Sequence, residues 1–159
     1  WGKPLAHRMG RAWGQGIACN VYSEDCYIAQ VADVSVGDEK QDIRVHRVVC
    51  AVDCGQVINP AGLDGQAESG ITWGLSAALY GRIDFKNGGA VQKNYKDFPV
   101  LRINEAPAVE TYIVPSHESP GGFGETAVPP VIPAVANAVF AATGKRMRRL
   151  PITPEKLRA

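Results

Sequence analysis

Three segments typical of neighbouring β-strands follow one another in residues 16–52, GIACNVYSEDCYIAQVADVSVGDEKQDIRVHRVVCAV. Residues 16–22 and 27–36 are rich in β-branched and aromatic side chains, which favour extended backbone, and the polar residues between them suit a short turn. A second turn leads to residues 43–52, whose second half is continuously apolar and is predicted to be buried on both faces. This stretch therefore predicts the centre of a β-sheet.

Two helices are predicted after these strands. Asp64 offers an N-cap for the first helix, and its glycines Gly70 and Gly74 would let another element pack closely. The second helix is expected from about residues 134–143 and ends at Gly144; it is apolar almost all round, which is typical of a helix buried inside a larger body. The apolar residues on one face of the first helix are Ala67, Ile71, Leu75, Ala78 and Leu79.

Two shorter patterns complete the predicted fold. Asn87, Gly88 and Gly89 lie between two short extended runs, which indicates a hairpin. Residues 109–114 alternate as a half-buried strand does. Together the patterns predict an α/β (α+β) fold with a mixed sheet of about five or six strands and two main helices.

Composition excludes several classes of protein. The chain has 159 residues, of which 45% are hydrophobic and 21% charged, and its 17 Lys and Arg nearly balance 16 Asp and Glu. These values are ordinary for a globular chain and argue against a disordered tail or a protein that coats nucleic acid. No apolar run approaches the ~20 residues of a membrane span. The basic group at 145–149 is better explained by the end of the second helix than by a nucleic-acid patch.

Cysteine and histidine spacing gives no metal site. The four cysteines lack a Cys-x-x-Cys pair, and we expect structural thiols. The histidines are scattered, so this chain's own side chains are not expected to hold a metal. These residues are Cys19, Cys26, Cys50, Cys54, His7, His46 and His117.

The most unusual local chemistry is a glycine-rich loop at residues 119–125, SPGGFGE, which ends in Glu125. Its glycines would allow a ligand to approach the backbone closely, and a carboxylate partly shielded from water could act as a general base. Asp53 and Asp64 are further carboxylates that the fold could bring near it. Carboxylates after glycines are also common turn residues, so the pattern alone leaves both interpretations open. The common nucleotide-binding and hydrolase motifs are absent from the sequence.

Longer runs of sequence resemble a known family. Residues 116–125, SHESPGGFGE, and the region 129–151 resemble the C-terminal end of the molybdenum-binding subunit of the xanthine oxidase family, especially the large (beta) subunits of its isoquinoline 1-oxidoreductase and aldehyde-oxidising members. Earlier runs agree in order, and we expect residues 1–159 to be a single C-terminal piece of a larger molybdopterin-binding subunit. These runs are RVHRVVCAVDCGQVIN (44–59), QAESG (66–70), GLSAALYG (74–81), 95–102 and 104–107.

The resemblance implies a molybdenum-dependent oxidoreductase that hydroxylates an isoquinoline-like N-heteroaromatic compound, or oxidises an aldehyde, with oxygen from water. Glu125 matches the catalytic base of the family, and Gln66 matches a glutamine that contacts the pterin. Gly122, Phe123 and Gly124 match the cofactor-binding loop. Phe123 replaces a small aliphatic residue, which leaves pocket size and substrate open, and Ser69 replaces a usual glycine.

The same resemblance implies cofactors and partners outside the chain. They are molybdopterin, expected as the cytosine dinucleotide, the remainder of the large subunit, a small subunit with 2Fe-2S clusters and an external electron acceptor. The isolated piece is expected to bind no molybdenum and to be inactive. Cytoplasmic is the default compartment, with the periplasm as the alternative. The competing function is a noncatalytic assembly or interaction module, which has no physical need for Glu125 and Gln66; nucleic-acid binding ranks last.

Overall fold

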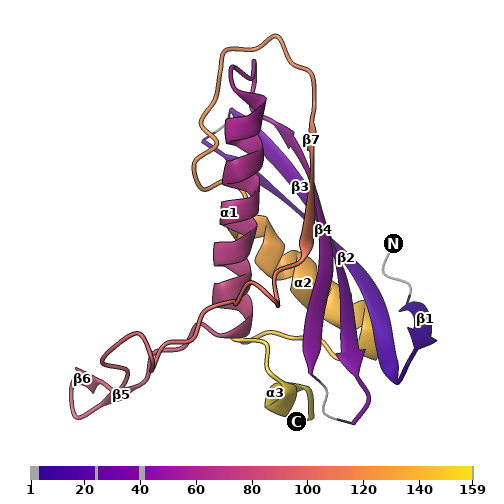
Figure 1. Cartoon of the computed structure of the whole chain (residues 1–159), viewed down its shortest axis with the longest axis vertical. Helices are drawn as coiled ribbons and strands as arrows, with labels where there is room; N and C mark the ends of the chain where they lie inside the picture. Colours follow the sequence, from indigo (N-terminus) through magenta and orange to yellow (C-terminus); the bar gives the residue numbers. More distant parts are fainter. Residues whose placement is uncertain (1–3, 24, 40–41, 159) are drawn as a thin grey trace.

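The computed structural model describes residues 4–23, 25–39 and 42–158, and its main body is a five-stranded sheet with two long helices on one face (Figure 1). The strand order is β1-β2-β3-β4-β7; neighbours from β1 to β4 are antiparallel, and β7 runs parallel to β4. The strands are β1 (Pro4–Arg8), β2 (Arg11–Tyr22), β3 (Cys26–Gly37), β4 (Ile43–Asp53) and β7 (Ala108–Ile113). The predicted mixed sheet is confirmed, and β1 is a strand that the sequence pattern did not indicate.

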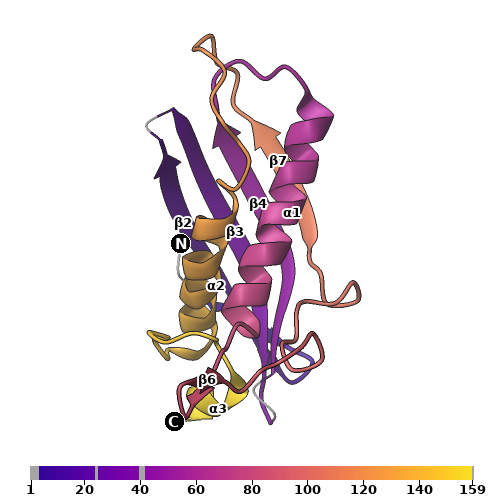
Figure 2. The same ribbon diagram turned by 90° about the vertical axis from the view of Figure 1, so that its left-hand side faces the viewer.

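The helices α1 (Pro60–Leu79) and α2 (Val128–Thr143) lie side by side on the sheet (Figure 2). The predicted close packing of the first helix is confirmed: a Cβ on Gly70 would lie 2.8 Å from the Cβ of Ala127, and one on Gly74 would lie 2.3 Å from Val131. The core between sheet and helices is formed by fully buried side chains. They include Ala32, Val34, Val48, Cys50, Ala67, Ile71, Leu75, Val131, Val135 and Val139.

Smaller elements lie at the end of the molecule where α1 finishes. The strands β5 (Phe85–Lys86) and β6 (Gly89–Ala90) form the predicted hairpin, with positive φ at Asn87 (52°) and Gly88 (77°). This geometry is what an Asn-Gly turn favours. A short helix, α3 (Pro154–Arg158), ends the described chain. Among the described residues, no helix has the length and apolarity required to cross a bilayer.

The predicted starts of both helices were wrong. α1 begins one turn before Asp64, because Asn59 is its N-cap: the side chain accepts a hydrogen bond of 3.1 Å from the Gly62 N–H, and Pro60 follows where a free N–H is not needed. α2 begins at Val128 instead of about residue 134: Pro129 and Pro130 lie in its first turn, where no N–H is needed, and Pro133 lies inside the helix. Its predicted stop is confirmed, since Gly144 is left-handed with φ 73°.

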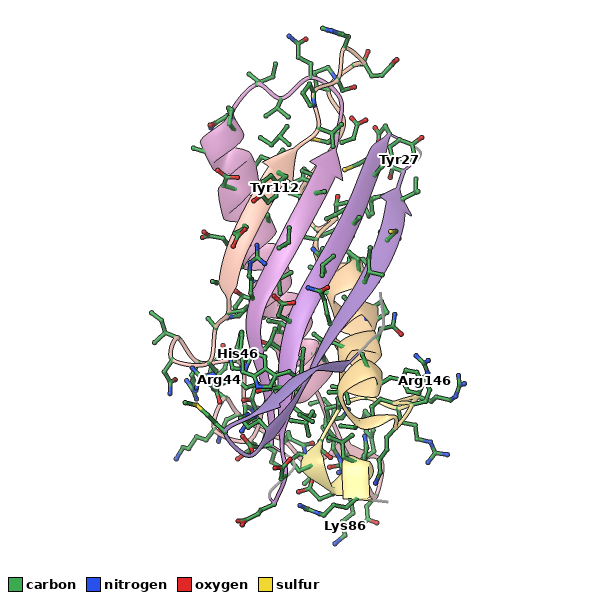
Figure 3. All side chains as sticks on the ribbon, turned by 90° about the vertical axis from the view of Figure 1, so that its right-hand side faces the viewer. Tyr27, Arg44, His46, Lys86, Tyr112 and Arg146 are labelled. Carbon is green, nitrogen blue, oxygen red and sulfur yellow. The ribbon has the colours of Figure 1, made fainter. Side chains whose placement is uncertain are left out.

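One burial prediction was also wrong. In β4 the side chains of Val48, Cys50 and Val52 are fully buried, but Val49 and Ala51 on the opposite face are only partly covered. The helices cover one face of the sheet, and the other lies open, as seen around Tyr27 and Tyr112 in Figure 3. In this chain α2 is buried along the side facing the sheet and α1, and burial of its other side by the rest of a larger subunit stays a prediction.

Two of the basic residues after α2 contact other parts of the chain. The Lys145 ammonium donates a hydrogen bond to the carbonyl of Leu157, and the Arg146 guanidinium lies 3.6 Å from the centre of the Phe140 ring. Arg146 also donates to Asn137 Oδ1 at 3.0 Å. Lys145 therefore links the end of α2 to α3, and Arg146 contacts side chains of α2.

The thiols differ in exposure, which predicts their reactivity. Cys26, Cys50 and Cys54 are free and buried, and Cys19 is free and exposed. Burial raises the pKa of Cys50 to about 11, so the reactive thiolate is scarce near neutral pH. We therefore expect a maleimide to label Cys19 rapidly, and Cys50 only after unfolding, as measured by peptide mass spectrometry. Equal labelling of both residues in the folded protein would contradict the buried position of Cys50.

A glycine loop and a groove at the end of the sheet

The predicted glycine loop is fixed to the connection between β4 and α1, at the end of the sheet where α1 begins (Figures 1 and 2). The Gly121 N–H donates to the Cys54 carbonyl at 2.8 Å, and the Gln56 N–H donates to the Glu118 carbonyl at 3.0 Å. Gly55 has φ 72°, and a Cβ there would lie 2.1 Å from the Ser119 carbonyl oxygen. Backbone contacts therefore set the position of the loop.

The three loop glycines have different roles. A Cβ on Gly121 would lie 2.8 Å from the carbonyl oxygen of Asp25, so this glycine permits packing within the chain. Around Gly122 and Gly124, no atom of the described residues lies within 4 Å of an added Cβ. Space beside these two residues is open to another molecule, as expected of the loop from its sequence.

This difference predicts the stability of two matched variants. Gly121→Ala forces its methyl group against backbone, and we expect a loss of about 1–3 kcal/mol in the free energy of unfolding. Gly122→Ala adds the same methyl group to open space and should change the free energy of unfolding by less than about 0.5 kcal/mol. Denaturant unfolding measures both values. Equal stability of the two variants would contradict the packing of the loop against Asp25.

A groove of about 330 Å³ lies between this loop and the first turns of α1. Three predicted cofactor-binding residues, Gln66, Phe123 and Gly124, line it together, whereas Gly122 and Glu125 are not part of its lining. The complete lining is Cys54, Gln56, Val57, Ile58, Asn59, Gly62, Leu63, Gln66, Pro120, Gly121, Phe123 and Gly124.

The chemistry of the groove suits a polar ligand that carries negative charge. Side-chain amides come from Gln56, Asn59 and Gln66, and the N-terminal end of α1 adds a partial positive charge. The lining residues include no Asp or Glu that would repel an anion. Amides and backbone groups can also bond the edge of a heterocycle. Asn59 was not predicted as a site residue, although an Asn-Pro pair before a helix is a recognisable start signal.

Glu125 lies beside the groove, and its side chain is exposed in this chain. The partial shielding from water that was expected from the sequence is therefore not provided by the described residues. Its Oε1 accepts a hydrogen bond of 3.0 Å from the hydroxyl of Tyr22, which comes from the end of β2. This bond and the negative charge of Glu125 raise the pKa of the Tyr22 phenol. Tyr22 was predicted only as a strand end, since no local pattern links it to a residue 103 positions away.

Buried polar side chains anchor the backbone that follows Glu125. The amide Nε2 of Gln30, in the central strand β3, donates to the Ala127 carbonyl at 3.0 Å. Gln30, Thr126 and Ala127 are all buried. The Gln30 Oε1 atom is also buried and lacks a hydrogen-bond partner among the described residues. Gln30 was missed as well, because a polar residue within an apolar strand does not reveal its partner.

The other carboxylates considered from the sequence have local roles. Asp53 Oδ1 accepts a hydrogen bond of 3.2 Å from the Gly55 N–H, and Asp64 is exposed within the first turns of α1. In the part of the chain that the structure describes, no three His, Cys, Asp or Glu side chains are grouped so that they could hold a metal ion.

Known proteins are similar to this chain in sequence and in fold. Residues 10–107 match the model of the molybdopterin cofactor-binding domain. A subunit of nicotinate dehydrogenase from Pseudomonas putida is 38% identical over 134 residues, which are 84% of this chain and 11% of the relative. The beta subunit of isoquinoline 1-oxidoreductase from Brevundimonas diminuta is 33% identical over 145 residues, 91% of this chain and 18% of the relative.

A solved structure has the same fold. Quinoline 2-oxidoreductase from Pseudomonas putida 86 superimposes with a TM-score of 0.77 and 23% identity, covering 83% of this chain and 18% of that chain. The present chain thus spans less than a fifth of the length of these relatives. From the extent of the family match and the identity to curated subunits, the chain belongs to the molybdopterin cofactor-binding domains of the molybdenum-binding subunits in the xanthine oxidase family.

Proposed function

We propose that this chain is the C-terminal part of the large subunit of a molybdenum hydroxylase, with Glu125 as the catalytic base. The substrate class would be an N-heteroaromatic compound or an aldehyde, and water would supply the oxygen. The observation that carries the proposal is the position of Glu125 on a fixed glycine loop, directly beside the groove that contains Gln66. Relatives named for nicotinate and isoquinoline support the heteroaromatic class.

The groove fits a phosphate-bearing pterin. Gly124 leaves open space where a side chain would otherwise stand, and the amides of Gln56 and Gln66 can bond polar ring atoms. The N-terminal end of α1 favours a phosphate group. We propose that Gln66 and the Gly122–Gly124 loop contact the cofactor, in its cytosine dinucleotide form. When bound, the molybdenum cofactor supplies an acceptor for two electrons beside the substrate.

The residues of this chain then have distinct tasks. Glu125 takes the proton that is lost when water becomes the source of the new hydroxyl oxygen, and its Oε2 atom is the oxygen not bonded to Tyr22. Phe123 is partly buried against the core and also lines the groove, so its ring limits the room in the groove. Electrons are proposed to leave through 2Fe-2S clusters on a small partner subunit to an external acceptor.

The proposal is tested with the full-length subunit co-expressed with its small subunit. Molybdenum is measured by metal mass spectrometry and the pterin nucleotide by chromatography, and the same preparation is assayed with quinoline-type heterocycles and aromatic aldehydes. We expect close to one molybdenum per subunit and substrate-dependent reduction of an artificial electron acceptor. A correctly folded complex without molybdenum would contradict the proposal and favour the noncatalytic module.

A further inference from the structure

We propose that Tyr22 is a positioning residue for Glu125: its hydroxyl holds one carboxylate oxygen so that the other faces the reacting group. The inference rests on the proposed function of Glu125 as the base. The hydrogen bond from the Tyr22 hydroxyl to Glu125 Oε1 is 3.0 Å long and joins strand β2 to the glycine loop. Because a carboxylate has two oxygens, an oriented bond to Oε1 leaves Oε2 free to accept a proton.

The ring of Tyr22 is held by packing. The Cα of Tyr22 pairs with the Cα of Cys26 at the end of the β2–β3 ladder, and the register of this ladder is continuous back to Arg11. The ring packs against a cluster of buried side chains beneath the loop. Those side chains are Cys26, Val52, Cys54 and Leu63. A side chain with few accessible rotamers orients its hydrogen bond at a small entropy cost, so the phenol is a rigid donor.

The acceptor is also held in place. Gly121 brings the loop against Asp25, which belongs to the β2–β3 turn that follows Tyr22. On the other side of Glu125, the Val128 N–H donates to the Glu125 carbonyl at 2.9 Å, and Gln30 anchors Ala127. Donor and acceptor are therefore carried by two backbone segments that are fixed to each other.

The protonation state of Tyr22 suits this role. Its phenol pKa is raised above the usual 10.0, first by the hydrogen bond to Glu125 and then by the charge of Glu125. The hydroxyl therefore remains protonated, and remains a donor, throughout the neutral range.

The test uses Tyr22→Phe in the molybdenum-loaded complex, because this variant removes only the hydroxyl. Tyr112→Phe is the matched control: its phenol donates to Glu110 Oε2 at 3.3 Å on the opposite face of the sheet. For Tyr22→Phe we expect kcat to fall about ten-fold with little change in KM, because the base is still present but its carboxylate is no longer oriented by the phenol. Tyr112→Phe should have the kcat and the KM of the wild type.

A second readout does not depend on turnover. Tyrosines labelled at the ring carbon that bears the hydroxyl are titrated by NMR in the metal-free full-length subunit, and Tyr22→Phe assigns the resonance of Tyr22. We expect the Tyr22 midpoint to fall in Glu125→Gln, since the charge that raises it is lost. An unchanged midpoint would overturn the proposal, whatever the role of Glu125. An unchanged kcat in Tyr22→Phe would overturn it as well. If Glu125→Gln retained wild-type turnover while the midpoint fell, the proposed base would fail although the hydrogen bond existed.

Discussion

Replacing Glu125 with Gln should lower the kcat of the full-length enzyme by about 100-fold or more, with molybdenum content unchanged. Loss of a general base costs this much in other enzymes, because an amide has nearly the same shape as a carboxylate but cannot take up the proton. Glu125 lies outside the lining of the groove, so its side chain should not be needed to retain the cofactor. Steady-state kinetics and metal analysis on the same preparation measure both quantities.

The matched control is Glu118→Gln, which changes an exposed glutamate directly before the same loop. Its contact with the β4–α1 connection is made by the backbone carbonyl, which the substitution preserves. Turnover of this variant should stay within about two-fold of wild type, as expected for a surface change without a catalytic role. Equal turnover in the Glu125 and Glu118 variants would assign Glu125 a structural role. Loss of molybdenum from Glu125→Gln alone would make it a cofactor-binding residue.

The largest loss of stability is expected for Gly16→Val. A Cβ on Gly16 would lie 2.2 Å from both the Ala134 carbonyl oxygen and the Ala138 nitrogen, so α2 rests directly on the backbone of β2. A branched side chain would push the helix away and open the core, and overpacking against backbone that cannot give way costs about 3 kcal/mol or more. This is a large share of the stability of a small domain.

Gly65→Ala is the control for this prediction. Gly65 lies within α1, and no atom of the residues that the structure describes is within 4 Å of an added Cβ, so alanine should raise the free energy of unfolding by up to about 1 kcal/mol through helix propensity. Denaturant midpoints of the two variants should therefore move in opposite directions. If Gly16→Val unfolded at the wild-type midpoint, the close contact between α2 and β2 would be wrong.

Local sequence patterns predicted most of the secondary structure, because strand propensity and turn residues act between neighbours in the sequence. The β-branched runs around Val31 and Val49 lie in β3 and β4, and the Asn87-Gly88 turn forms the expected hairpin. Burial of the second sheet face depends on what packs there, which an apolar run does not specify. The start of α1 was misplaced because two cap residues, Asn59 and Asp64, compete within five positions, and Pro60 favours the earlier one.

The candidate site was only partly predictable. Glycines beside a carboxylate pointed to the loop, and the family resemblance added Gln66, which shares a groove with Phe123 and Gly124. The exposure of Glu125 was not foreseen, and neither was its bond to Tyr22. Contacts between a strand and a distant loop arise from the tertiary fold, and a single sequence has no periodic signal for them.

The source of oxygen in the product distinguishes the proposed hydroxylation from other oxidations. The full-length subunit with its small partner is supplied with a heterocyclic or aldehyde substrate in water enriched in heavy oxygen, under ordinary air, and the product is analysed by mass spectrometry. We expect the new oxygen atom of the product to come from the labelled water. Product oxygen derived from air, or no product from a complex fully loaded with molybdenum, would contradict the proposed function.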